Sequence, residues 1–295
     1  MTPHPPAILV AALAWLVWAA LAHALCRNPR RHPLGGFAYG FARLYVPLWH
    51  GLRVVGAENL PPARPAADRD ALPALVGPAG RPVIVVANHT AGLDPLLIYL
   101  AIPHAFPRFV MAADMRVGSL EDFWSFGRII FIDRHRGSDH AALRAALDHL
   151  RAGGTLGLFP EGRIRTSDVP LHPFQPGLAL LLARTKAAVL PVVITGTPLH
   201  PTAWASLYVP TRLASPAGRI TLTIMPIFDH LALGIRPADA PAALESLFRQ
   251  QLGLPMTPGP AGAAARPPGP PRAPQGPPAG PGNGPSAISP PAAAR

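Results

Sequence analysis

Short apolar runs alternate with segments of helical periodicity through the middle of this chain. The runs are rich in β-branched residues and predict strands at 83–87, 108–112, 129–132, 155–159, 189–195 and 220–227. Helices are predicted between and after them at 138–153, 177–186 and 239–252. This alternation is typical of an α/β domain in which helices flank a largely parallel sheet. Groups that act on a ligand are then expected at the strand ends and in the loops that follow them.

The segment 7–26 contains no formally charged residue, and as a helix it would span about 30 Å, roughly one hydrocarbon core. Three arginines follow it within five residues, and no Lys or Arg precedes it. We therefore predict an N-terminal anchor in the inner (cytoplasmic) membrane, with the remaining domain facing the cytoplasm. The alternative is a cleaved signal peptide, because 22–24 has the small-x-small form, but the first six residues lack the usual positive charge. Whether the segment spans the bilayer or lies at its surface stays open.

Three further regions complete the organisation of the chain. Residues 37–55 are apolar and aromatic with a break at Pro47, which predicts helices in the membrane interface or, equally, an amphipathic helix packed on the domain. Residues 61–82 predict a loop from their Pro and Gly content. Pro, Gly and Ala dominate the last part, which predicts a disordered tail. The expected parts are a membrane segment, interfacial helices, one α/β domain and the tail, at 1–31, 32–60, 61–254 and 255–295.

The formal net charge of +11 favours an anionic partner, such as an anionic lipid or a phosphorylated substrate. The same Arg excess also fits a compositional bias toward Ala, Pro, Gly and Arg. No nucleic-acid partner is expected, because the sequence has no zinc-ligand spacing, no aromatic–Arg interleaving and no Arg-rich helix. The single cysteine, Cys26, excludes an internal disulfide framework and a cysteine zinc cluster.

A histidine and an aspartate separated by four residues follow the predicted strand 83–87 directly, as His89 and Asp94. If the segment turns into a helix, the Asp94 side chain can fold back toward His89. A carboxylate bonded to one ring nitrogen fixes the tautomer and leaves the other nitrogen free as a base. This is the base-and-orienter half of a catalytic triad without its serine, so a hydroxyl of the substrate could be the nucleophile.

Two arginine-containing segments also follow predicted strands. In 131–137, Arg134 and a second arginine could hold a phosphate by bidentate hydrogen bonds. In 159–166, Glu161 could bind a polar headgroup or hold an arginine, and Gly162 permits a close backbone approach. Each segment alone also fits a solvated, charged loop.

A fourth segment, 189–196, has no titratable group. It predicts a buried strand with Pro191 at an edge or bulge, or a wall that shapes a slot for an acyl chain.

These four segments, in this order, resemble the glycerolipid acyltransferases related to bacterial 1-acylglycerol-3-phosphate acyltransferase. The resemblance covers about residues 51–252 and is carried by two motifs of that family. The first is its His-x4-Asp, here His89 and Asp94, and the second is its Phe-Pro-Glu-Gly, here 159–162. The segment 55–61 also resembles the lead-in to the first motif.

The resemblance implies roles for the matching residues. His89 would deprotonate the acceptor hydroxyl, and Asp94 would orient His89. Substrate-binding positions would be Asn88, Arg134, Glu161, Gly162, Arg163 and Pro191, with Arg134 on the phosphate of the acceptor. The family takes acyl-CoA or acyl-acyl-carrier-protein as donor and a lysophospholipid as acceptor, works at membrane lipid, and needs no metal or other cofactor.

The sequence departs from the family pattern near the expected acceptor site. Arg128 stands where the family usually has a glycine, six residues before Arg134. Glu161 and Gly162 are followed by Arg-Ile-Arg rather than Thr-Arg-Ser, and the loop 61–82 is longer than expected. Acceptor identity therefore stays open, with lyso-ornithine lipid or a glycolipid precursor as alternatives. A non-catalytic lipid-binding protein and a metal-dependent hydrolase are the other hypotheses.

Overall fold

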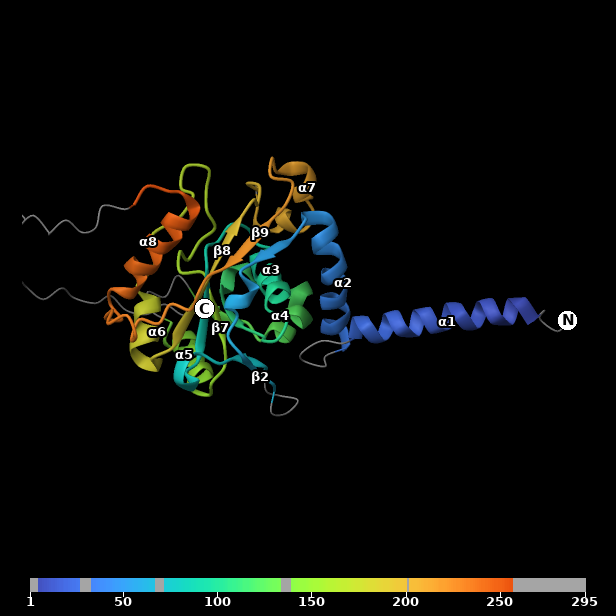
Figure 1. Cartoon of the computed structure of the whole chain (residues 1–295), viewed down its shortest axis with the longest axis horizontal. Helices are drawn as coiled ribbons and strands as arrows, with labels where there is room; N and C mark the ends of the chain where they lie inside the picture. Colours follow the sequence, from blue (N-terminus) through green and yellow to red (C-terminus); the bar gives the residue numbers. More distant parts are fainter. Residues whose placement is uncertain (1–4, 27–32, 67–71, 134–138, 201, 257–295) are drawn as a thin grey trace, which may run out of the picture. The chain divides into compact units, whose positions relative to one another are not determined.

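The computed structural model describes residues 5–26, 33–66, 72–133, 139–200 and 202–256. Contacts divide the chain into two units, Met1–Met256 and Thr257–Arg295. The second unit, and with it nearly all of the predicted tail, lies outside the described residues. The first unit is an α/β domain with two preceding helices (Figure 1).

A seven-stranded sheet forms the centre of the domain, in the order β1-β9-β8-β4-β7-β5-β6. All neighbouring pairs are parallel except β8 and β9, so β1 and β9 run against the other five strands. The prediction of a largely parallel sheet is therefore confirmed. The strands are β1 (Arg53–Val55), β4 (Val83–Ala87), β5 (Arg108–Ala112), β6 (Ile130–Ile132), β7 (Leu156–Leu158), β8 (Ala188–Thr195) and β9 (Thr221–Ile224).

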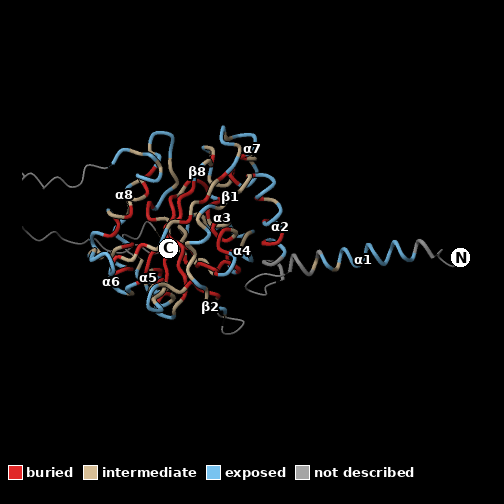
Figure 2. The backbone as a smooth tube through the Cα atoms, in the orientation of Figure 1, coloured by how far each residue is buried: buried red, intermediate tan, exposed pale blue. Residues whose placement is uncertain are grey.

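Helices cover both faces of the sheet, and β4 shows why. Its five residues are all buried, and alternate side chains point to opposite faces. Val83 and Val85 join a core with α2 (Pro33–His50), α3 (Asp94–Ala101) and α4 (Glu121–Gly127). Ile84 and Val86 join a second core with α5 (His140–Arg151), α6 (Gly177–Thr185) and α8 (Ala240–Leu252). Figure 2 shows this buried interior between the helix layers.

Two predictions concern the N-terminal part. The segment 7–26, for which a spanning and a surface position were both left open, forms a helix, α1 (Pro5–Cys26). Within the described parts of the chain, no helix combines the length and apolar character needed to cross a bilayer. The break predicted at Pro47 is wrong, because α2 continues to His50. Val46 and His50 are fully buried, so packing holds the last turn despite the N–H that proline lacks.

The predicted loop 61–82 contains a small second sheet. β2 (Ala63–Arg64) pairs antiparallel with β3 (Ala74–Leu75), and residues 67–71 between them lie outside the described residues. The N–H of Leu75 donates to Thr155 Oγ1 at 2.7 Å, which ties this insertion to the start of β7. The insertion is therefore a packed part of the domain.

Pro191 lies in the interior strand β8, opposite a bulge. Val192 pairs with Ile224, and Val189 pairs with Phe228. Two residues of β8 between these pairs therefore lie opposite three residues of the segment 224–228, which is the extra residue of a bulge. The carbonyl of Pro191 accepts from Met225 N at 2.9 Å. Since N–H and C=O of one strand residue point to the same side, the missing N–H of Pro191 faces the bulge and leaves no regular ladder bond unmade. The predicted bulge is confirmed.

Candidate active site

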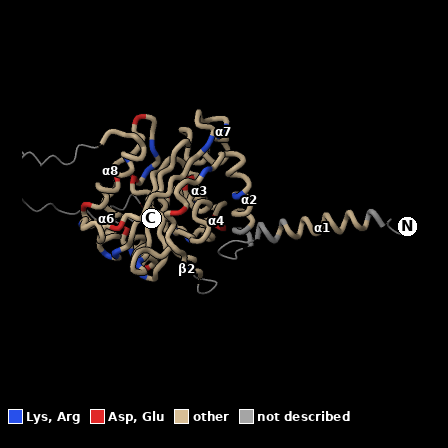
Figure 3. The backbone as a smooth tube through the Cα atoms, viewed as in Figure 1, with Lys and Arg blue, Asp and Glu red and all other residues tan. Residues whose placement is uncertain are grey.

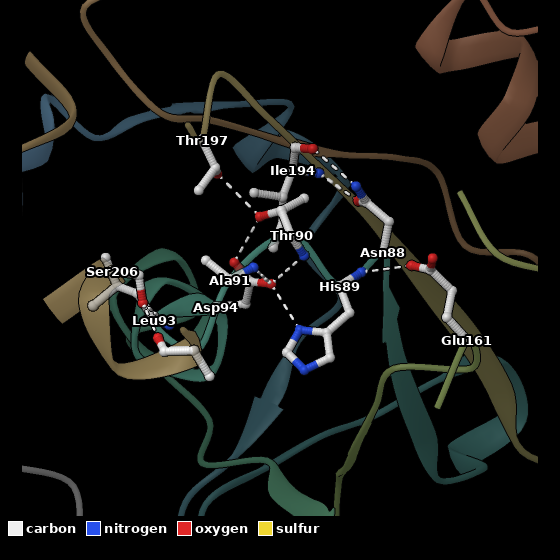
Figure 4. Close-up of polar contacts among 11 residues, drawn as sticks. Asn88, His89, Thr90, Ala91, Leu93, Asp94, Glu161, Ile194, Thr197 and Ser206 are labelled. Atoms are coloured by element: carbon white, nitrogen blue, oxygen red, sulfur yellow. Dashed lines mark hydrogen bonds and ion pairs between the residues drawn. The ribbon is translucent and has the colours of Figure 1, made fainter. Parts of the chain in front are cut away.

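His89 and Asp94 lie in contact where the chain passes from the central strand β4 to α3. β4 ends at Ala87, the next six residues form a loop, and the helix begins at Asp94 itself. The Nδ1 atom of His89 lies 2.9 Å from Asp94 Oδ2 (Figure 4). The loop and the first turn of the helix thus bring together the two residues that the sequence motif singled out.

Asp94 is fully buried, and the loop before it supplies its hydrogen bonds. Its Oδ2 accepts from the backbone N–H of Thr90 at 2.6 Å and of Ala91 at 2.9 Å. Its Oδ1 accepts from the Thr90 hydroxyl at 2.8 Å. An ionised carboxylate can only accept hydrogen bonds, so His89 Nδ1 carries the proton of the bond that it shares with Asp94. The lone pair of the neutral imidazole then lies on Nε2.

The imidazole of His89 is held flat against an aromatic ring. It stacks on Phe159 with centroids 4.2 Å apart and planes 14° apart. Its side chain keeps 19% of its surface exposed, and Nε2 points away from Asp94 without a partner among the described residues (Figure 4). This atom is therefore placed to take a proton from a bound hydroxyl group.

Glu161 holds the backbone of His89. It is buried, and its carboxylate accepts from His89 N at 2.6 Å and from His172 N at 2.7 Å. Burial raises the pKa of Glu161 to about 7, although these two N–H groups act to lower it. Both carboxylate oxygens are therefore engaged by backbone N–H groups, one of which belongs to the loop 88–93 that carries His89, called the catalytic loop below. The family resemblance predicted contact with the acceptor, and the structure gives this side chain a second task.

Arg165 reaches the catalytic loop from the same segment. Its N–H donates to the His89 carbonyl at 2.9 Å, and its guanidinium donates to the Thr197 carbonyl after β8. Burial and the nearby charge of Arg165 lower the pKa of His200, and Asp94 partly offsets this. His200 thus lies close enough to Arg165 and Asp94 to sense their charges. Arg163, the predicted ligand, is exposed.

The other predicted residues have different positions. The Asn88 side chain makes two hydrogen bonds with the backbone of Ile194: its Nδ2 donates to the carbonyl at 2.9 Å, and its Oδ1 accepts from the N–H at 2.7 Å. These bonds join the ends of β4 and β8. Gly162 is exposed with φ +69°, which favours glycine. Pro191 is buried within β8. Arg134 lies outside the described residues. The described residues contain no group of three or more His, Cys, Asp and Glu that could hold a metal.

Several residues of the site were not predicted. Thr90 bonds to Asp94 and also lies 3.0 Å from Thr197 through their hydroxyls. A Cβ added to Gly92 would lie 2.4 Å from the Ala203 carbonyl, so only glycine permits this approach. The position of Thr90 beside His89 was a usable signal. Ser206, which accepts from Leu93 N at 3.0 Å, stands 113 residues away and gave none.

An oriented imidazole at the end of the central strand of an α/β sheet is the framework of a general-base enzyme. Residues 51–195 match the family model described as Acyltransferase. The chain belongs to this acyltransferase family, and the matched region holds both His89 and Glu161.

Curated relatives share only part of their length with this chain. N-acylphosphatidylethanolamine synthase of Arabidopsis thaliana is 32% identical over 130 residues, 40% of this chain and 46% of that protein. 1-Acyl-sn-glycerol-3-phosphate acyltransferase beta of Homo sapiens is 24% identical over 191 residues, 63% of this chain and 65% of that protein. The chain therefore spans less than two thirds of the length of either relative.

The fold is also similar to that of a solved structure. The 1-acyl-sn-glycerophosphate (LPA) acyltransferase from Thermotoga maritima matches with a TM-score of 0.52 and 20% identity, over 75% of this chain and 79% of that chain. At this identity the likeness is one of fold.

Proposed function

We propose that this protein transfers a fatty acyl group from acyl-CoA or acyl-acyl-carrier-protein to the free hydroxyl of a lysophospholipid. The preferred acceptor is 1-acylglycerol-3-phosphate, which gives phosphatidic acid. The observation that carries the proposal is the His89–Asp94 pair, with Nδ1 bonded at 2.9 Å and Nε2 open. Membership of the acyltransferase family supports the reaction class.

The dyad suits direct transfer without a covalent acyl-enzyme. His89 Nε2 takes the proton of the acceptor hydroxyl while its oxygen bonds to the thioester carbonyl carbon. The tetrahedral intermediate then expels the thiolate, which takes the proton back from the imidazolium. Asp94 stabilises that imidazolium through Nδ1–H. Base catalysis of this kind contributes about a hundredfold to ten-thousandfold in rate.

Basic side chains beside the dyad support an anionic acceptor. Arg165 contacts the backbone on both sides of the site, and the side chain of Arg163 in the same loop is exposed. His200 is near enough to Arg165 for the guanidinium charge to help lower the pKa of this histidine. A phosphate bound here would be held by guanidinium and imidazole groups. The relative from Homo sapiens is named for 1-acyl-sn-glycerol-3-phosphate as substrate, which agrees with this choice.

We place the reaction at the cytoplasmic surface of the inner membrane. Phe37, Phe41, Leu44 and Leu48 form an exposed apolar stripe on α2. A helix with such a stripe can lie in the interface of a bilayer, where lysophospholipids reside. Thioester donors would reach the site from the cytoplasm.

The test is acyl transfer by the purified full chain, wild type beside His89→Ala. Labelled oleoyl-CoA is offered with 1-acylglycerol-3-phosphate and, separately, with lyso-ornithine lipid. Wild type is expected to acylate the first acceptor, and His89→Ala to lose at least about a hundredfold in kcat. The exposed His104 supplies the matched control, because it follows the C-terminal end of α3, whereas Asp94 begins that helix. His104→Ala should therefore keep full activity.

The outcomes separate the hypotheses. Transfer only to lyso-ornithine lipid would keep the mechanism and replace the acceptor. Failure with both acceptors, repeated with an acyl-acyl-carrier-protein donor, would remove the proposal and favour a lipid-binding protein. Loss of activity in a chelator would favour the metal-dependent hypothesis.

A further inference from the structure

The 202–215 segment lies along the C-terminal half of α2. It contains a short helical turn (Ala203–Leu207) and α7 (Thr211–Ala214). Tyr45 Oη donates to the Leu207 carbonyl, and Trp49 Nε1 donates to the Tyr208 carbonyl at 3.1 Å. The buried His50 Nδ1 lies 2.9 Å from Thr211 Oγ1. Polar contacts therefore fasten the segment to α2 at three successive places.

The two elements present apolar side chains to the outside together. In the 202–215 segment Leu207, Tyr208 and Leu213 are exposed, Leu213 to 86%. The Leu207 and Tyr208 carbonyls accept hydrogen bonds from α2, and Leu213 follows two residues whose side chains contact α2, Thr211 and Arg212. These exposed side chains therefore lie beside the stripe of exposed residues on that helix. We call the combined set the apolar face, made of Phe37, Phe41, Leu44, Leu48, Trp49, Leu207, Tyr208 and Leu213. A contiguous face of this kind marks an interaction surface.

The two segments that form the apolar face carry formal charges of one sign. Neither 33–57 nor 202–228 contains an Asp or Glu; the first acidic residue after each range is Glu58 and Asp229, respectively. The two ranges contain four exposed arginines, at 43, 53, 212 and 219. Figure 3 shows a basic position on α2 and others near α7. An apolar surface with an arginine rim complements an anionic bilayer better than it complements a second copy of the same basic surface.

The 202–215 segment also contacts the catalytic loop. The buried Ser206 Oγ accepts from Leu93 N at 3.0 Å and donates to the Ala203 carbonyl at 2.7 Å. That carbonyl is the atom that excludes any Cβ at Gly92. Leu93 directly precedes Asp94, so the contact lies next to the dyad. One side of the segment therefore faces outward with the apolar face, and the other supports the loop that carries His89.

We propose that the apolar face docks on an anionic bilayer and that Ser206 links the docked face to the catalytic loop. The docking part stands on the surface alone, whereas the link rests on the proposed acyl transfer. When the face is seated in lipid, the 202–215 segment is held in place, and through the Ser206–Leu93 bond it holds the loop before Asp94. Ser206 is a positioning residue in this scheme.

Docking is tested by flotation of the purified full chain with vesicles of phosphatidylcholine, with and without phosphatidylglycerol. Wild type is expected to float with the anionic vesicles. Leu213→Glu should weaken this binding at least about tenfold. The change removes a leucine that docking would bury in lipid, and it adds a negative charge that the anionic lipid repels. Leu233→Glu is the matched control, because Leu233 is also an exposed leucine. It follows Phe228, which pairs with Val189 at the start of β8, whereas the catalytic loop lies at the end of that strand.

Two results would overturn docking. The first is equal vesicle binding by wild type and Leu213→Glu. The second is a dimeric wild type that Leu213→Glu turns into a monomer, which would make the face a contact between copies. Neither measurement needs activity, so failure of acyl transfer would not be confused with failure of docking. Thermal unfolding of both variants checks that they fold.

The link is tested with a short-chain acceptor dissolved as monomers. Adding acceptor-free anionic vesicles should stimulate transfer by wild type about fivefold, the equivalent of one net hydrogen bond. Ser206→Ala should bind the vesicles as wild type does and lose the stimulation, with a change in kcat rather than in KM. A Ser206→Ala protein that is still stimulated as wild type is would refute the link. Leu213→Glu should lose stimulation in parallel with its binding.

Discussion

Four contacts fix His89, and they come from two separate parts of the sequence, the start of α3 and the segment 159–165. Asp94 holds Nδ1 from the start of α3. Phe159 supports the ring, Glu161 accepts from the backbone N–H, and Arg165 donates to the backbone carbonyl. The Phe-Pro-Glu-Gly motif therefore acts here on the base as well as lying beside the expected acceptor. Orientation of a catalytic base by neighbours that do not themselves react is a recurrent means of lowering the cost of reaching the transition state.

Glu161→Gln tests this residue-scale account. The amide would point an N–H group at one of two backbone N–H donors, which leaves a buried donor unpaired and costs about 1–3 kcal/mol. We expect kcat to fall roughly tenfold to a hundredfold with the KM of the acceptor nearly unchanged. Glu121→Gln is the control, since Glu121 forms an exposed pair with Arg116. A raised KM with unchanged kcat would instead make Glu161 a direct ligand of the acceptor.

The end of α4 shows a conflict between an element and its sequence. Arg128 caps this helix with φ 45°, in the left-handed region where glycine is usual. The resemblance to the family put a glycine at this position, and the backbone keeps the conformation that such a residue would adopt. The Arg128 carbonyl also accepts from Arg108 Nε at 2.7 Å, so a neighbour depends on this geometry. The helix end therefore carries a strain that its own sequence does not relieve.

Arg128→Gly should raise the free energy of unfolding by about 1 kcal/mol relative to Arg128→Ala, because a Cβ in this region costs about 1–2 kcal/mol and the freer unfolded chain offsets part of it. Urea denaturation of both variants measures the difference, and comparing Gly with Ala removes the effect of the lost charge. Equal stability of the two variants would contradict the strain. Acyl transfer should stay within about twofold of wild type if the Arg108 contact is kept.

At the scale of the whole molecule, the domain encloses two histidines that burial keeps neutral. Burial lowers the pKa of His50, on the α2 side of the sheet, to about 4. The pKa of His149, at the end of α5 on the other side, is also lowered to about 4, chiefly by burial. His149 Nε2 lies 2.9 Å from the Thr155 carbonyl, which suits the neutral ring as a donor. The unfolded chain would protonate both residues near pH 6.5.

The domain should therefore lose stability as the pH falls from about 6.5 toward about 4. In that window the two histidines bind protons in the unfolded chain but stay neutral in the folded chain. Each can therefore lower the free energy of unfolding by up to roughly 3 kcal/mol. Chemical denaturation at pH 7.5, 6.0 and 5.0 measures the fall. The double variant His50→Asn, His149→Gln keeps hydrogen-bonding atoms without the titration, and it should show a clearly flatter profile. An unchanged slope in that variant would assign the acid sensitivity to other groups.

The sequence by itself determined the local features of this protein. Apolar periodicity located six of the seven main strands, two of them without deviation and the others to within three residues at each end. The reason is that burial on both faces of a sheet demands continuous β-branched runs. The spacing of His89 and Asp94 predicted their contact, because a loop that leads into a helix closes over so short a separation. The stretch from α2 to β1 was less predictable. Whether the helix continues past Pro47, and whether 53–55 forms a strand, depends on the segments that pack or pair with them.

Only the tertiary structure decided how these local pieces meet. Many strand orders satisfy the same apolar pattern, so the order β1-β9-β8-β4-β7-β5-β6 and the reversal at β9 could not be predicted from it. The same holds for Glu161 on the backbone of His89, 72 residues away, and for Ser206 on Leu93, 113 residues away. Such contacts depend on the folded position of two distant segments. No local preference of either segment encodes them, because the free energy that holds them comes from packing around both.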